Sequence, residues 1–177
     1  GLGRRCTASE PIVEFRAMRE APPDRIRQLN QAGERPDGKF VLYWMVANRR
    51  TRYNFSLQHA LAHAERLNRP LLVLEALRSD YPWASDRLHR FVIQGMVDNS
   101  EALQRTNAVY HPYVEPEMGA GKGLLDALAD SATVIVTDDF PTFFLPRMVE
   151  AAAARLTVRL EVVDSNGIVP LATSLPD

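Results

Sequence analysis

The chain has 177 residues, of which 46% are apolar and 24% charged, and its net charge is -1. This length supports about one domain with a real core, and the composition excludes intrinsically disordered and membrane-embedded proteins. The near-neutral charge also argues against a protein that grips duplex DNA alone, because phosphate neutralisation supplies most of the affinity of such proteins.

Cys6 is the single cysteine, so no disulfide can form within the chain, which is typical of a reducing compartment. The first residues lack the apolar region of a secretory signal, and no apolar run approaches the roughly 18 residues of a transmembrane helix. We therefore expect a cytoplasmic protein that does not associate with membranes. The chain does not begin with Met, which indicates an artificial start or a partial gene model.

Residues 1–38 form a lead-in segment in which we expect no strand. Ile26 and Leu29 lie among basic residues, and their spacing predicts a short, basic, amphipathic helix that packs on the edge of the domain without binding a ligand. The sequence Pro36-Asp37-Gly38 is a strong turn signal, after which the folded domain is expected to begin.

From residue 39 to residue 164, apolar strand patterns alternate with helical patterns. We expect strands at 40–46, 71–76, 108–114, 133–137 and 158–163, and helices at 54–68, 86–105, 124–130 and 145–155. The strands are continuous apolar runs, as in buried parallel strands, although Pro112 weakens the third. This pattern predicts a Rossmann-like, doubly wound α/β domain with about five mostly parallel strands and helices on both faces.

The segment from Phe40 to Leu57 contains a buried strand, a basic loop and a helix that Asn54 caps. In an open α/β sheet, ligands bind at the carboxyl ends of the strands. The loops at 47–54, 77–85 and 138–144 should therefore converge at one edge of the sheet. We expect Arg50, Asn54, Asp138 and Phe140 to surround a ligand cleft there.

Asp138 and Asp139 follow the fourth strand as a carboxylate pair that could bind a metal or a ribose hydroxyl. The aromatic residues Phe140, Phe143 and Phe144 come next. They could form an apolar wall for a planar ligand or for another domain, or they could be buried against the helices of the sheet. Both readings stay open on the sequence alone.

Other motifs are expected to be structural. The run from Gly119 to Gly123 fails the phosphate-loop pattern and predicts a flexible loop, whose amides could still hold an anion. His59 and His63 have a metal-ligand spacing, but we expect them on the solvated face of their helix and predict no metal site. His89 is expected to be structural or to line a pocket. No nucleophile elbow is present, so no serine-histidine-acid triad is predicted.

Three segments resemble the amino-terminal domain of class II DNA photolyases, which repair cyclobutane pyrimidine dimers with light. The matching residues are Tyr43-Trp44-Met45 with a loop arginine and Asn54, the set Arg25, Arg27, Leu29 and Asn30, and the Val163-Asp164 and Val169-Pro170 pairs. The resemblance covers about residues 25–174. Val46 and Phe55 replace polar residues of the family, which counts against pigment binding more than against the fold.

The resemblance implies that this domain supplies either a cleft for an antenna pigment, a deazaflavin in some members, or an architectural surface. FAD and the dimer pocket would lie in a helical flavin-binding domain, and damaged DNA would be contacted only through that domain. Residues 165–177 would begin the linker to it, as an apolar segment with no element after it. The chain alone is then expected to hold no cofactor and to be inactive. The alternative is a stand-alone α/β binding module for a nucleotide-like ligand, without repair activity.

Overall fold

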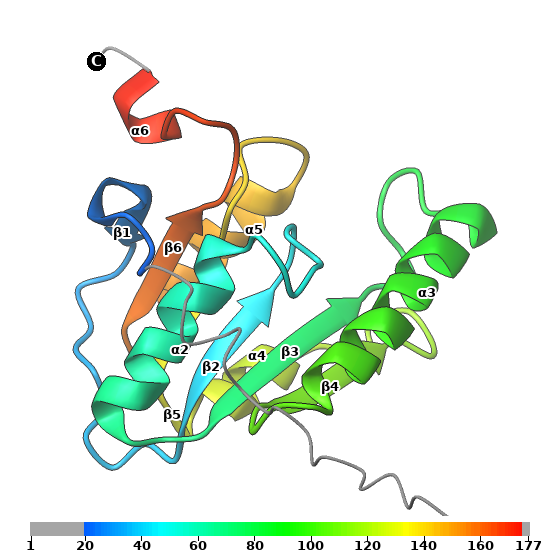
Figure 1. Cartoon of the computed structure of the whole chain (residues 1–177). Coiled ribbons are helices and arrows are strands. Elements are labelled where there is room, and N and C mark those ends of the chain that lie inside the picture. Colours follow the sequence, from blue (N-terminus) through cyan, green and yellow to red (C-terminus); the bar gives the residue numbers. More distant parts are fainter. Residues whose placement is uncertain (1–19, 175–177) are drawn as a thin grey trace, which may run out of the picture.

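The computed structural model describes residues 20–174, which fold into a six-stranded sheet with helices on both faces (Figure 1). The strands are β1 (Ile26–Gln28), β2 (Phe40–Met45), β3 (Leu71–Leu77), β4 (Val109–Val114), β5 (Ala132–Asp139) and β6 (Leu160–Asp164). The helices are the 3-10 turn η1 (Pro23–Arg25) and α2 (Phe55–Leu67), α3 (Asp86–Leu103), α4 (Leu124–Ala129), α5 (Leu145–Arg155) and α6 (Leu171–Ser174). In the described part, no helix is both long and apolar enough to cross a membrane.

The strand order is β1-β6-β5-β2-β3-β4, and all pairs except β1 with β6 are parallel. The chain moves outward from β2 through β3 to β4, then returns to β5 on the other side of β2. This reversal places a topological switch point between β2 and β5, the usual ligand site of doubly wound sheets. The predicted fold class is confirmed, and each predicted strand after residue 39 is present with small shifts at its ends.

The expectation that residues 1–38 contain no strand is wrong. Ile26–Gln28 pairs antiparallel with β6, so the predicted basic helix is instead a short edge strand, and the sheet has six strands rather than about five. Three residues are too few to show a strand periodicity of their own. The backbone adopts this conformation because the exposed edge of β6, far away in sequence, supplies its hydrogen-bonding partners.

The two faces of the sheet bury separate apolar clusters. Alternate residues of β2 divide between them: Val41, Tyr43 and Met45 face the side covered by α2 and α3, whereas Leu42 and Trp44 face α4 and α5. Figure 1 shows these helix pairs on opposite sides of the sheet. The proline in β4 is tolerated because β4 is an edge strand with no neighbour on one side.

From the sequence, we expect an apolar segment after β6 with no further element. The structure differs, because the one-turn helix α6 follows that segment. Arg25 holds the turn before α6, and its buried guanidinium donates to the carbonyl oxygens of residues 164, 166, 167 and 168. The Leu171 amide donates to Asp164 at 2.7 Å. The tail is therefore tied to the lead-in segment.

Candidate functional site

The switch point is filled by the carboxylate of Asp138. Its Oδ2 accepts hydrogen bonds from the backbone amides of Val46, Ala47 and Asn48 at 3.0, 2.8 and 3.0 Å. The hydroxyl of buried Tyr43 donates to Oδ1 at 2.8 Å. Three convergent amides are the arrangement with which a loop binds a phosphate or another anion. Here a side chain of the domain itself occupies that position.

Asn54 completes the same buried network. Its amide donates to the Tyr43 hydroxyl at 2.9 Å and to the carbonyls of Asn48 and Arg50, while its Oδ1 caps α2 at the amide of Leu57. Burial and the adjacent Asp138 charge raise the pKa of Tyr43 well above its usual value, so this hydroxyl stays a donor. Both donors and the acceptor of Asn54 are thus used inside the domain.

The glycine loop after β4 is organised in the same way. The carboxylate of Glu115 accepts hydrogen bonds from the amides of Ser79, Gly119 and Gly121, and from the Ser79 hydroxyl. The amides that could have held an anion in this loop therefore bind an internal carboxylate. The Ser79 and Gly121 amides outweigh the effect of desolvation and lower the pKa of Glu115 below its usual value of 4.5.

A pH dependence follows from the lowered pKa of Glu115. Because the folded state favours the charged carboxylate, its contribution to stability is present above the unfolded pKa and is lost as the pH falls through the folded pKa. We expect Glu115→Gln to be less stable than the parent at pH 7 and to lose less stability between pH 7 and pH 3. Urea unfolding at several pH values measures this difference, and parallel pH profiles of the two proteins would contradict it.

Arg49, in the loop after β2, neutralises a carboxylate inside the sheet. Glu75 on β3 has no exposed surface, and its Oε1 lies 3.1 Å from Nη1 of Arg49. Asn99 and Tyr110 donate to Oε2 at 2.9 and 2.6 Å. Burial and the hydrogen bond to Glu75 raise the pKa of Tyr110, which keeps its hydroxyl protonated. Arg49, the first basic residue of this loop, is half-buried and pairs with a carboxylate of the core.

The four residues expected around a cleft are brought to the same edge, but they do not line one cavity. Asn54 and Asp138 share the buried network, whereas Arg50 is exposed and donates to the carbonyl of Tyr53. Phe140 lines a cavity of about 60 Å³ between β5, β6 and α5, and Asp138 and Asp139 also line it. Asp139 itself pairs with Arg27 at 2.9 Å. Ligand binding by these four residues stays a prediction.

The predicted convergence of the three loops is confirmed. Asp138, at the end of β5, accepts hydrogen bonds from the loop after β2. The loops after β3 and β5 contact each other through two aromatic pairs. The ring centroids of Tyr81 and Phe144 lie 6.2 Å apart, and those of Trp83 and Phe143 also lie 6.2 Å apart. The parallel pairing of β2, β3 and β5 explains why all three loops emerge at the same edge.

Each of these loops also exposes one aromatic residue in a strained backbone conformation. Tyr53, Trp83 and Phe143 have positive φ angles of 52°, 70° and 61°, and their exposed fractions are 87%, 75% and 72%. Bulky residues rarely adopt this left-handed conformation, and such strain clusters at functional sites. The sequence showed aromatic residues here, but their exposure and strain are tertiary properties.

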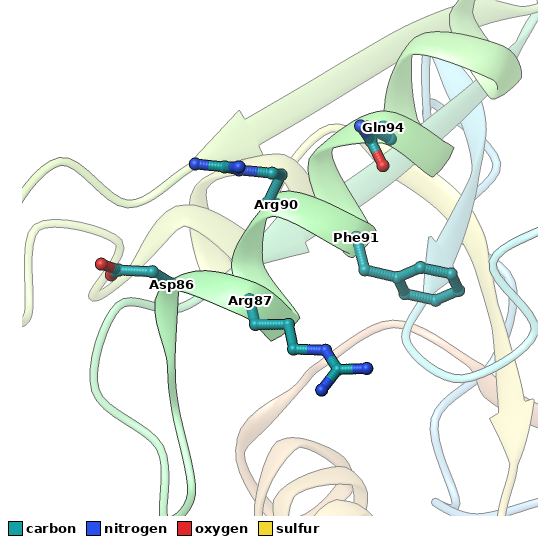
Figure 2. A pocket seen from close by; sticks show the side chains of 5 residues that line it. All are labelled: Asp86, Arg87, Arg90, Phe91 and Gln94. Atoms are coloured by element: carbon teal, nitrogen blue, oxygen red, sulfur yellow. The ribbon is translucent and has the colours of Figure 1, made fainter.

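The amino-terminal half of α3 extends this apolar surface. Figure 1 shows α3 running beyond the carboxyl ends of β3 and β4, and its Leu88, Phe91 and Ile93 side chains are exposed. A surface hollow of about 400 Å³ lies against its first turns, lined by Asp86, Arg87, Arg90, Phe91 and Gln94 (Figure 2). These residues come from one helix, so the hollow is an open surface feature rather than an enclosed pocket.

The expectation that His59 and His63 lie on the solvated face of α2 is wrong. His63 is buried, His59 is half-buried, and both imidazoles contact Glu161 of β6 at 2.8 and 2.7 Å. The i, i+4 spacing places both imidazoles on one face of the helix, and that face packs on the sheet next to β6. His89 contacts Tyr81, with ring centroids 5.5 Å apart, and Nε2 of His89 is buried without a hydrogen-bond partner among the described residues.

The lead-in segment contains four residues that match the photolyase pattern, and all have structural contacts: Arg25, Arg27, Leu29 and Asn30. Arg25 clamps the turn before α6, and Arg27 pairs with Asp139. The Leu29 amide donates to the carbonyl of Leu160, and Asn30 receives the Leu160 amide while donating to two carbonyls of the segment before β6. These four residues therefore attach the lead-in segment to β6 and to the segments beside it.

Comparison with known proteins gives two relatives of the same name. The deoxyribodipyrimidine photo-lyase of Methanothermobacter thermautotrophicus is 36% identical over 153 residues, which are 85% of this chain and 33% of that protein. The deoxyribodipyrimidine photo-lyase of Arabidopsis thaliana is 26% identical over 155 residues, covering 84% of this chain and 31% of that protein. No protein-family model matches the chain.

The chain spans about a third of the length of the curated relatives it matches. Both matches cover most of the described α/β domain, since each spans more than four fifths of the chain. The resemblance to DNA photolyases that is inferred from the residues is confirmed by these matches: the chain is a homologue of part of the deoxyribodipyrimidine photo-lyases.

Proposed function

We propose that this chain is the α/β domain of a class II photolyase that repairs cyclobutane pyrimidine dimers with light. Its contribution is an architectural surface on which a helical flavin-binding domain packs. That partner domain would hold FAD and contact damaged DNA, so the α/β domain alone performs no catalysis. The observation that carries this proposal is the exposed, strained aromatic set of Tyr53, Trp83 and Phe143, which lies at the carboxyl edge of a photo-lyase homologue.

An architectural role is better supported than an antenna cleft. A pocket for a molecule the size of a deazaflavin has a volume of roughly 300–1,000 Å³. The cavity beside Phe140 has only about 60 Å³, and the larger hollow on α3 is open and formed by one helix. Exposed apolar side chains on the β3–α3 and β5–α5 loops and on α3 are instead typical of a protein-binding face.

The nucleotide-binding alternative receives less support from the loops. A nucleotide-like ligand would place its phosphates on free backbone amides at the carboxyl edge. The amides of residues 46–48 and of Gly119 and Gly121 already bind Asp138 and Glu115. We propose a cytoplasmic location on the basis of the single cysteine, Cys6.

Complementation in trans tests this function. The purified chain should contain no flavin and should repair no dimers under blue light. Mixed with the two thirds of the Methanothermobacter protein that lie outside the match, it should form a complex and restore light-dependent repair above the level of that portion alone. Failure of the two polypeptides to associate, or a flavin-fluorescent preparation of this chain by itself, would contradict the proposal.

Self-association of the isolated chain is a second expected consequence of the uncovered surface. Interdomain interfaces bury roughly 600–1,500 Å², and exposed apolar area of that order drives association. We expect sedimentation to show concentration-dependent oligomers that Phe143→Ser reduces. Val109→Ser is the matched control, because Val109 is also exposed but lies at the amino end of β4. Equal association of parent and Phe143→Ser would remove Phe143 from the interface.

A further inference from the structure

We propose that His59, His63 and Glu161 form a binding site for a zinc ion, remote from the carboxyl edge. The two histidines lie one turn apart on α2, so their imidazoles project from one face of the helix. Glu161 lies near the amino end of β6, and it faces α2 because it alternates with Val163, which packs in the α2 cluster. Helix packing on the sheet therefore brings the three side chains together.

The three ligand atoms converge on one point. Nε2 of His59 and Nε2 of His63 lie 3.2 Å apart, and each lies within hydrogen-bonding distance of the same oxygen, Oε2 of Glu161, at 2.7 and 2.8 Å. Tetrahedral zinc, with bonds of about 2.0–2.1 Å, separates its ligand atoms by about 3.3 Å. The two nitrogens already have this separation, and Oε2 would move outward by about 0.5 Å to complete the geometry.

Without a metal, the same three side chains form a hydrogen-bonded cluster. Nη2 of Arg66 lies 2.7 Å from Nδ1 of His63, so in the neutral ring Nδ1 accepts and the proton is on Nε2. If Nε2 of His59 is also protonated, both imidazoles donate to Oε2 of Glu161. If it is not, its lone pair faces the carboxylate oxygen at 2.7 Å. A cation at the centre would take the place of the Nε2 protons, because both nitrogen lone pairs and the carboxylate oxygen can then point at it.

The surrounding residues suit monodentate coordination. Arg159 pairs with Oε1 of Glu161 at 2.8 Å, which leaves Oε2 for the metal. Oε1 of Glu34 lies 3.9 Å from Nδ1 of His63 and pairs with Arg66. When Nε2 of His63 binds metal, its proton is on Nδ1, and Glu34 is placed to accept it as Arg66 turns away. Carboxylates commonly orient metal-binding histidines in this way.

The donor set selects the metal. Two imidazoles and one carboxylate, with water as a fourth ligand, are a zinc set, whereas calcium and magnesium prefer oxygen ligands only. The His59 side chain keeps 16% exposure, which gives water and the ion a route to the site. A zinc ion here would link α2 to β6 and would stabilise the α/β domain, since it binds the folded state alone.

Titration of the EDTA-treated chain with zinc sulfate tests the proposal. We expect one ion bound per chain by calorimetry, a higher thermal unfolding midpoint with zinc, and, with Co²⁺ in its place, the visible absorption bands of tetrahedral coordination. His63→Asn and Glu161→Gln should each lower the zinc affinity at least about tenfold, because even loss of an outer-shell partner costs 10–100-fold.

Matched controls separate this site from other ligands. His111→Asn changes an exposed histidine of β4, and Cys6→Ser removes the single thiol, which lies outside the described residues; both variants should bind zinc like the parent. Circular dichroism of the metal-free variants establishes that each one is folded. Absence of zinc binding to the folded parent, or equal binding by parent and His63→Asn, would show that the cluster is only a hydrogen-bonded contact between α2 and β6.

Discussion

Replacing Asp138 with alanine is expected to destabilise the domain by about 4 kcal/mol or more. The substitution leaves the Tyr43 hydroxyl and the amides of residues 46–48 without their acceptor in a buried position. Each buried group left unsatisfied costs about 1–3 kcal/mol, and water that enters the new space recovers only part of this. Domains of this size have a total stability of roughly 5–15 kcal/mol, so the variant should be close to unfolding at room temperature.

The neighbouring carboxylate provides the control. Asp139→Ala removes a partly exposed ion pair with Arg27, and such pairs contribute about 0–1 kcal/mol. Urea unfolding of the two variants should therefore give very different midpoints, although the substitutions are adjacent and chemically identical. Equal midpoints would mean that the hydrogen bonds of Asp138 do not stabilise the switch point, and that the backbone amides of residues 46–48 are available to a ligand.

Arg49→Met should have an effect of similar size. The substitution leaves the fully buried carboxylate of Glu75 without its cation, and breaking one partner of a buried ion pair costs about 3–5 kcal/mol. The second variant, Arg49→Met with Glu75→Gln, should recover part of the loss, because the remaining buried side chain is neutral. Thermal and urea unfolding would measure both effects.

Arg50→Met is the matched control for this prediction. Arg50 is adjacent in sequence, but it is exposed and its guanidinium contacts only the nearby carbonyl of Tyr53 among the described residues. We expect a change of less than about 0.5 kcal/mol, as for ordinary surface substitutions. A large effect of Arg50→Met, or a small effect of Arg49→Met, would reverse the roles that the structure gives these two arginines.

The sequence by itself determined the layered α/β architecture. Continuous apolar runs such as 40–46 are stable only when both faces are covered, and the intervening helical patterns provide that cover. The Asn54 cap is also predictable from the sequence, since a capping side chain accepts a hydrogen bond from an amide only three residues away. These features depend on periodicity or on contacts within one turn, which is why they could be predicted from residue order.

Only the tertiary structure decided how the polar residues are used. Asp138 looks like a ligand-binding group in the sequence, yet its partners are amides that are distant along the chain. Glu115 and Glu75, for which the sequence predicts no role, also have partners that are distant along the chain. The edge strand at Ile26–Gln28 and the convergence of His59 and His63 on Glu161 likewise depend on β6, about 100 residues or more away in sequence. Packing brings such groups within hydrogen-bonding distance, and no local pattern encodes which distant backbone edge or carboxylate will be the neighbour.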